Sequence, residues 1–266
     1  MKIALFSDVH ANRPALEAVL DSIDAHRPDQ IYCLGDLVGY APWPNEVVET
    51  IRRRQIPTIA GNYDEGVGNN SDDCGCAYQT EIDQKRGDQS IAYTNEVIQS
   101  DHRRWLRTLP RHIRLQLGAD AEFSLLLVHG SPRKINEYLF EDRNESSMYR
   151  MMARAGADVM LFGHTHQPYH KPLVEEDNDE NPRCRHAVNI GSVGKPKDGD
   201  PRACWVLLTV DEDPEPGAAE SIDVDFVRVS YDVEEAATGV EDSPLPDAFA
   251  DMLRRGGKVD QTMPQH

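Results

Sequence analysis

The chain has 266 residues, and its 28 basic and 46 acidic side chains give a net charge of −18. Such an acidic surface repels polyanions, so tight binding to duplex nucleic acid is not expected. No stretch reaches the roughly 18 apolar residues of a membrane span, and the apolar start is too short for a signal peptide. We therefore expect a cytoplasmic protein with no membrane partner.

The first third of the chain alternates apolar runs with amphipathic segments. The runs at 2–6, 30–34 and 56–60 are predicted strands. Residues 14–27 and 45–54 carry apolar side chains at helical spacing. This βαβαβ pattern indicates parallel strands with helices packed on them.

The remainder of the chain is predicted to be rich in strands. Residues 66–78 form an irregular polar segment, and helices are expected over 89–108 and 146–156. The predicted strands are 113–117, 123–128, 158–162, 168–174, 185–190, 204–210 and 222–231. We expect one domain over 1–235, and a polar tail over 236–266 that could pack as a short helix or remain mobile.

Residues that can bind metals follow several of the predicted strands at the point where each strand ends. They are Asp8, His10, Asp36, Asn62, His129, His164 and His166. Because the carboxyl ends of strands meet at one edge of an α/β sheet, these residues are expected to converge.

The residue types fit two divalent ions, since imidazoles and carboxylates suit Mn, Fe, Zn, Ni or Co. We expect Mn, with Ni, Co, Fe or Zn as alternatives. Asp36 is expected to bridge the ions, because it stands alone after its strand and Gly35 leaves room beside it. Asp8 and His10 are two residues apart, so both side chains can turn toward one ion.

Five motifs occur in order, each after a predicted strand: SDVHAN, GDLVGY, GNYD, HGSP and GHTHQP. Over about residues 1–195 they resemble the calcineurin-like metallophosphoesterase superfamily, in particular its small prokaryotic phosphodiesterases. The resemblance implies an α/β fold, a four-layer αββα sandwich of two mixed β-sheets flanked by helices.

The resemblance also implies how the ligands are shared. One ion would be held by Asp8, His10, Asp36 and His166. The other would be held by Asp36, Asn62, His129 and His164. Two ions can hold a bridging hydroxide that attacks phosphorus, so no protein nucleophile is needed. We expect a dinuclear-metal-dependent phosphoester hydrolase.

The GNYD motif differs from the pattern of many relatives, which have a histidine where this chain has Tyr63. A phenol with a pKa near 10 is a poorer proton donor at neutral pH than imidazolium. We therefore expect a phosphodiesterase, or a phosphatase for good leaving groups, with Asn62, Tyr63, Asp64 and His129 as catalytic residues. The alternatives are that Tyr63 packs against the cleft and that Asp64 only stabilises its loop.

Three further residues are candidates for substrate binding: Asn12, Ser192 and Lys195. Ser192 and Lys195 belong to a glycine-rich segment that can present N–H groups to an anion. The alternative is that Lys195 is merely solvated. Cys74 and Cys76 could form part of a lid, contact a metal or simply pack, and the odd total of five cysteines argues against a disulfide framework.

Two other functions remain open at this stage. A nuclease is disfavoured by the acidic surface and by the lack of an aromatic and basic groove. A non-catalytic, metal-binding interaction scaffold is suggested by the missing histidine at position 63. The expected partner is a small phosphoester substrate, and a homo-oligomer formed through the C-terminal strands stays open.

The composition also predicts adaptation to salt, because only 7 of the 28 basic residues are lysines and acidic residues dominate. We expect a halophilic protein whose activity and melting temperature rise with KCl concentration, the alternative being an ordinary acidic cytosolic protein. Measuring both quantities across a KCl series tests this, and an optimum in dilute buffer would contradict it.

Overall fold

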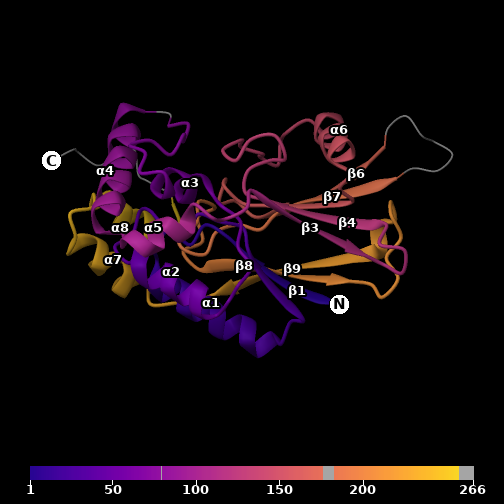
Figure 1. Cartoon of the computed structure of the whole chain (residues 1–266), viewed down its shortest axis with the longest axis horizontal. Helices are drawn as coiled ribbons and strands as arrows, with labels where there is room; N and C mark the ends of the chain where they lie inside the picture. Colours follow the sequence, from indigo (N-terminus) through magenta and orange to yellow (C-terminus); the bar gives the residue numbers. More distant parts are fainter. Residues whose placement is uncertain (79, 176–182, 258–266) are drawn as a thin grey trace.

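Two mixed β-sheets pack face to face and carry helices on their outer sides (Figure 1). The computed structural model describes residues 1–78, 80–175 and 183–257. Within these residues, α1 lies outside one sheet and α6 outside the other (Figure 1). The expected α/β class and four-layer arrangement are confirmed.

The first sheet has the strand order β2-β1-β8-β9. Its strands are β1 (Lys2–Phe6), β2 (Gln30–Cys33), β8 (Ala203–Val210) and β9 (Ile222–Val229). β1 pairs in parallel with β2 and antiparallel with β8, which in turn pairs antiparallel with β9. The central strand β1 therefore joins the N-terminal βαβ unit to the C-terminal strands.

The second sheet has the order β3-β4-β5-β7-β6. Its strands are β3 (His112–Leu117), β4 (Phe123–Val128), β5 (Val159–Phe162), β6 (Tyr169–Val174) and β7 (Cys184–Asn189). β4, β5 and β7 run parallel, and β3 and β6 are antiparallel edge strands. The parallel strands thus direct their carboxyl ends toward the same edge.

Strict alternation along the strands separates the core into layers. Ile3 and Leu5 face the space between the sheets, whereas Ala4 and Phe6 face the helices outside the first sheet. In the same way β4 turns Leu125 inward and Leu126 outward toward α6. Both faces of these strands are buried, which explains why they read as continuous apolar runs.

The helices gather mainly outside the first sheet and at one end of the sandwich (Figure 1). They are α1 (Arg13–His26), α2 (Pro44–Arg53), α3 (Asn62–Gly68), α4 (Glu81–Val97), α5 (Ser100–Leu106), α6 (Glu145–Ala155), α7 (Val233–Glu241) and α8 (Ala248–Arg254), with a 3₁₀ turn at Ala219–Ser221. α1 buries its predicted apolar stripe, including Leu16, Leu20 and Ile23. None of the described helices is long and apolar enough to cross a bilayer.

Three predicted elements differ from the structure. The third strand expected at 56–60 is reduced to one bridge between Cys33 and Thr58, because the Ala60 N–H donates to Pro110 instead. The GNYD motif is not a loop but opens α3 at Asn62. The helix expected over 89–108 is two helices, α4 and α5, which are separated by extended backbone at Ile98.

The C-terminal segment packs against the outer side of the first sheet. Most of α7 and all of α8 lie beyond residue 235, and they bury Ala237, Val240, Phe249 and Leu253 in the same core as α1. These apolar residues recur at helical spacing. The segment is polar on average, so its overall composition did not indicate two packed helices. Residues 258–266 of the expected tail lie outside the described residues, and the division at 235 stays a prediction.

The C-cap residue of α6 allows the energetic cost of a left-handed backbone conformation to be measured, because a side chain there would not clash with other atoms. Gly156 has φ +62°, and an added Cβ would meet no atom within 4 Å. We expect Gly156→Ala to lower the free energy of unfolding by about 1 kcal/mol, because the left-handed region disfavours a side chain.

Arg27 supplies a matched control, since it caps α1 in the same conformation with φ +50°. Arg27→Gly should therefore change stability in the opposite direction, by less than about 1 kcal/mol. Urea denaturation measures both variants. Unchanged stability of Gly156→Ala would contradict the explanation.

Candidate metal centre

Seven polar side chains converge at the carboxyl ends of the parallel strands. They come from the segments after β1, β2, β4 and β5 and from the first residue of α3. Their exposed fractions are 0–3%: Asp8 0%, His10 1%, Asp36 2%, Asn62 3%, His129 1%, His164 3% and His166 3%. All seven residues predicted as metal ligands thus lie in one buried region.

Asp8, His10 and His166 form the first cluster, with one potential ligand atom from each within 4.8 Å of the others. His166 Nε2 lies 3.2 Å from Asp8 Oδ1 and 3.2 Å from His10 Nε2. Two nitrogens and one oxygen therefore surround a common point, as the ligands of a single cation do.

Asp36, His129 and His164 form the second cluster by the same criterion. Asn62 adds a neutral oxygen, because its Oδ1 lies 3.1 Å from His129 Nε2. Asp36 stands between the clusters, with Oδ2 3.3 Å from His129 Nε2 and 3.7 Å from His10 Nε2. This position fits a bridging carboxylate.

Backbone carbonyls orient three of the imidazoles. The Nδ1 atoms of His10, His129 and His166 lie 3.1, 2.8 and 2.5 Å from the carbonyl oxygens of Val38, Leu34 and Lys195, respectively. A carbonyl can only accept, so each Nδ1 donates, and in the neutral imidazole each Nε2 keeps a lone pair that faces the centre. Such outer hydrogen bonds fix the tautomer of metal-binding histidines.

Two buried atoms at the centre lack a hydrogen-bond partner. They are Asp8 Oδ1 and His164 Nε2, and neither finds a donor within the described part of the chain. An unsatisfied buried polar atom costs about 1–3 kcal/mol. Both atoms face their clusters, so divalent cations would satisfy them, and the donor set of carboxylates, imidazoles and an amide fits such ions.

The protonation states of the first cluster also favour cation binding. Burial lowers the pKa of His166 to about 4, and it lowers the pKa of His10 and of His164 well below the usual range. Burial opposes ionisation of Asp8, but the nearby His166, His129 and His10 outweigh it and lower the pKa of that carboxyl. The first cluster thus presents an anion and neutral nitrogens. In the second cluster, burial lowers the pKa of His129, but the Asp36 carboxylate outweighs it and raises that pKa to about 10.

The backbone is strained at five of the ligand residues. Asp8, His10, Asp36, His164 and His166 have φ values of 55°, 48°, 52°, 66° and 62°. Residues with side chains rarely adopt this left-handed region, and such strain collects at functional sites. The tight turns carry both members of each His-x-His or Asp-x-His pair toward the centre.

Asp64 stabilises the segment beside Asp36. Its carboxylate accepts hydrogen bonds from the N–H groups of Leu37, at 2.9 Å, and Gly61, at 3.0 Å. Burial and the charge of Asp36 raise the pKa of Asp64 to about 7. Gly61 allows the close approach, since a Cβ there would lie 2.1 Å from Asp36 Oδ1. These contacts agree with the alternative that Asp64 stabilises its loop. A catalytic role of Asp64 stays a prediction.

Tyr63 is buried beside the first cluster, with 1% of its surface exposed. Its ring packs edge-on against His10 with centroids 5.5 Å apart, and its hydroxyl lies 3.2 Å from that of Tyr78. Its backbone N–H donates to Asp36 Oδ1 at 2.8 Å. Burial raises the pKa of the phenol well above its usual value, so Tyr63 remains a neutral hydrogen-bonding group.

The cysteine segment holds the amide of Asn62. Asn62 Nδ2 donates to the carbonyl of Cys74 at 3.1 Å and contacts the Cys76 sulfur at 3.2 Å. The amide oxygen is therefore free to face His129. Gly75 is tied from the other side by Asn136, whose Nδ2 donates to its carbonyl at 2.7 Å.

The predicted substrate-binding residues are buried, and two of them, Ser192 and Lys195, hydrogen-bond to residues of the first cluster. Asn12 caps α1 and donates to the Gly194 carbonyl at 3.0 Å. The Ser192 hydroxyl donates to the Asp8 carbonyl at 2.8 Å. The Lys195 ammonium lies 4.1 Å from the ring centroid of Tyr40, and burial lowers the pKa of this amine well below its usual value.

Aromatic side chains form part of the centre that sequence analysis did not identify. Tyr40 packs edge-on against His10 at 4.9 Å, and Tyr138 lies 4.1 Å from His164, both measured between ring centroids. Phe249 of α8 packs in turn against Tyr40 at 5.0 Å. Tyr40 ends the GDLVGY motif and Tyr138 closely follows HGSP, so proximity to a motif was the one available signal.

Comparison with known proteins agrees with this geometry. A family model described as the calcineurin-like phosphoesterase superfamily domain matches residues 1–213. An uncharacterized protein from Methanocaldococcus jannaschii is 32% identical over 268 residues, which cover 96% of this chain and 98% of that protein.

Two solved structures are similar over nearly the whole chain. A metallophosphoesterase from Sphaerobacter thermophilus is 31% identical, with 96% of this chain and 99% of that one covered and a TM-score of 0.69. A hypothetical protein from Pyrococcus horikoshii is 24% identical, with 97% and 99% covered and a TM-score of 0.77. The second similarity concerns the fold alone.

The two clusters predict a defined metal content. We expect about two divalent ions per chain in protein loaded with Mn²⁺, and about one after Asp8→Ala or His164→Ala, since each variant removes a ligand from one cluster. Elemental analysis gives the stoichiometry. Chelation should lower the melting temperature, because it removes ions bound only to the folded state.

A matched control is His112→Ala, which removes an exposed histidine outside both clusters and should leave the metal content unchanged. Fewer than two ions in the fully loaded wild-type chain would contradict the assignment of two clusters.

Proposed function

This chain belongs to the calcineurin-like phosphoesterase superfamily and is a metal-dependent phosphoesterase, and we propose that it is a dinuclear phosphodiesterase for small substrates. The observation that carries the proposal is the placement of Asp36, whose Oδ2 lies between two clusters of ligand atoms. A shared carboxylate of this kind reduces the repulsion between two cations.

We assign the ligands by cluster. One ion would bind Asp8, His10, Asp36 and His166. The other would bind Asp36, Asn62, His129 and His164. Two bound ions would activate a water for attack on phosphorus and stabilise the charge of the phosphoryl group. Mn is the proposed metal, because carboxylate, amide and imidazole donors without thiolate suit it.

Tyr63 supports the preference for diesters or good leaving groups. Its hydroxyl contacts Tyr78, and its high pKa makes it a hydrogen-bond donor rather than a general acid at neutral pH. An alkoxide leaving group needs a proton in the transition state. Substrates with a stable leaving group need no such donor, so they should react faster.

We propose that the segment 72–78 is a lid whose movement would admit the substrate. The seven ligand side chains are at most 3% exposed, and Cys74, Cys76 and Tyr78 lie directly over Asn62 and Tyr63. Opening would break the hydrogen bonds from Asn62 to Cys74 and from Asn136 to Gly75, together with the contact between the Tyr63 and Tyr78 hydroxyls. Lys195 would then meet the substrate phosphate from the opposite side.

A non-catalytic scaffold is the second candidate, and the burial of Tyr63 favours it. A packing tyrosine in place of a histidine leaves the metal ligands without a proton donor beside them. Two bound ions without turnover of any phosphoester would favour this candidate. The acidic composition supports the further proposal that the protein works in a salt-rich cytoplasm.

The role of position 63 can be tested with substrates of different leaving groups. We expect turnover of bis-p-nitrophenyl phosphate to exceed that of an alkyl monoester by at least tenfold in the Mn-loaded wild type. Tyr63→His should raise turnover of the alkyl monoester by roughly 10-fold or more, because a general acid contributes 10²–10⁴-fold.

Tyr63→Phe is the matched control, since it keeps the ring and removes the hydroxyl. It should leave the ratio between the two substrates within about threefold. Faster turnover of the alkyl monoester by the wild type would refute the preference for diesters.

A further inference from the structure

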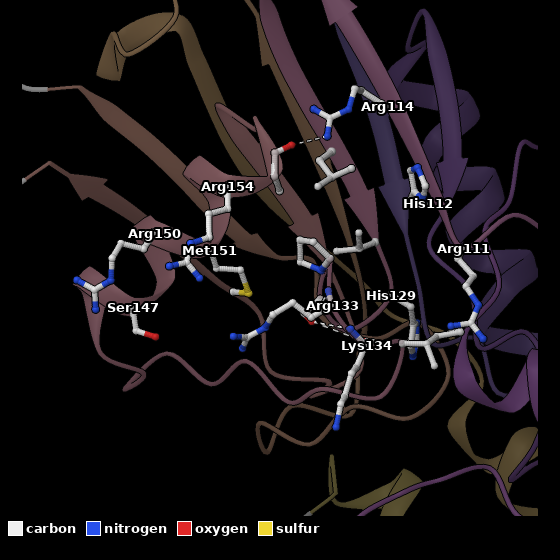
Figure 2. A pocket seen from close by; sticks show the side chains of 16 residues that line it. Arg111, His112, Arg114, His129, Arg133, Lys134, Ser147, Arg150, Met151 and Arg154 are labelled. Carbon is white, nitrogen blue, oxygen red and sulfur yellow. Dashed lines mark hydrogen bonds between the residues drawn. The ribbon is translucent and has the colours of Figure 1, made fainter.

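A cavity of about 530 Å³ lies on the outer side of the second sheet. Its walls are β3, one face of α6 and the segment 131–135 that follows β4 (Figure 2). Ser147, Arg150, Met151 and Arg154 line it from α6, at the spacing of one helical face. A cavity of this size accommodates a ligand of a few dozen atoms.

The lining of this cavity is strongly basic in a chain of net charge −18. It includes six cationic side chains and no carboxylate: Arg111, Arg114, Arg133, Lys134, Arg150 and Arg154. Acidic residues outnumber basic ones by 46 to 28 in the chain, so a surface without any carboxylate is a marked departure. The local potential should therefore attract anions.

Four of the six cations have no carboxylate partner among the described residues, and one of them, Arg114, donates to backbone carbonyls instead. Lys134, Arg150 and Arg154 form no ion pair with any carboxylate in residues 1–78, 80–175 and 183–257. By contrast, Arg111 pairs with Glu65, and Arg133 pairs with Glu137. Figure 2 shows Arg154 descending from α6 and Arg133 approaching from the segment after β4.

The floor of the cavity is apolar, and hydrogen bonds join two of its walls, β3 and α6. Leu126, Val128 and Met151 are buried beneath the cations. Arg114 joins β3 to the end of α6 by donating to the carbonyls of Ala155, at 2.6 Å, and Gly156, at 2.8 Å. The cavity thus combines a preformed apolar surface with a cationic rim, so it suits a ligand with an apolar or planar part and charged groups.

We propose that this cavity binds a small phosphorylated molecule with a planar ring, the chemistry of a nucleotide. The ring would lie on Leu126, Val128 and Met151, and the phosphates would pair with Arg150, Arg154 and Lys134. Guanidinium groups bind phosphate oxygens in a bidentate manner, and lysine adds a point charge.

This site is distinct from the metal centre and does not depend on the proposed hydrolysis. His129 contributes to the lining, yet its side chain has 0% exposure and directs Nε2 toward Asp36. The histidine therefore separates the cavity from the second cluster. A bound ligand would lie next to a metal ligand without reaching the ions.

A small molecule fits the observations better than a nucleic acid. The basic lining is confined to one cavity, whereas the chain as a whole is acidic and repels a long polyanion. Sequence-independent nucleic acid binding uses an extended groove with aromatic platforms. Among the residues that the structure describes, His112 and His129 are the aromatic side chains that line this cavity.

The test is calorimetric titration of Mn-loaded protein with α,β-methylene-ADP, which resists hydrolysis. Arg150→Gln/Arg154→Gln should weaken binding roughly tenfold or more, because charge-assisted contacts to phosphate are lost. Both side chains are exposed and lack ion pairs, so the fold should be retained, and the intact metal centre serves as an internal reference. Adenosine and pyrophosphate should each bind more weakly than the analogue.

The control is Arg53→Gln/Arg104→Gln, which removes two exposed arginines from α2 and α5 and should change the Kd less than twofold. Should the α6 variant fail to fold by circular dichroism, Lys134→Gln tests the opposite wall and should weaken binding at least threefold. Equal Kd values for the wild type and the tested variant would overturn the proposal. Tighter binding of a single-stranded oligonucleotide than of the analogue would overturn it as well.

Discussion

The structure of the metal centre depends on two buried carboxylates, Asp8 and Asp36. In each, one oxygen accepts a backbone hydrogen bond and the other faces the ligand clusters. Asp8 Oδ2 accepts from the His164 backbone N–H at 3.1 Å, which joins the segments that follow β1 and β5 and thus the two sheets. Asp36 Oδ1 accepts from the Tyr63 N–H and so fixes the start of α3. Their other oxygens, Asp8 Oδ1 and Asp36 Oδ2, face the clusters. Asp8 thus links the contact between the two sheets to the first cluster, and Asp36 links the start of α3 to both clusters.

The sequence was informative wherever a local pattern determines the result. Apolar runs located nearly every strand, and the order of the motifs located the ligand residues at strand ends. It was uninformative where tertiary contacts decide. The prediction of a strand at 56–60 was wrong, because the Ala60 N–H donates to the carbonyl of Pro110. The start of α3 depends on the Asp64 carboxylate, which accepts from the Gly61 N–H. The left-handed backbone conformation of Asp8 and Asp36 could not be predicted from the conformational preferences of aspartate.

The aromatic residues around the centre illustrate the same limit. Tyr40, Tyr63 and Tyr78 come from three separate segments, and their hydroxyl or ring contacts exist only in the folded chain. Tyr40 and Tyr63 pack edge-on against His10, and Tyr78 contacts the hydroxyls of both. Reactivity at such a centre depends on what surrounds the ligands as much as on the ligands themselves, since a low dielectric strengthens every charge interaction within it.

The C-terminal helices extend this wall from a distant part of the chain. Phe249 of α8 supports Tyr40 and lies 5.8 Å from the Lys195 ammonium, although it stands well beyond residue 213, where the family match ends. The aromatic wall beside His10 is thus built from two distant parts of the chain, the segment after β2 and the C-terminal α8. A substitution in α8 can therefore change the surroundings of His10 through Tyr40 while every ligand residue stays the same.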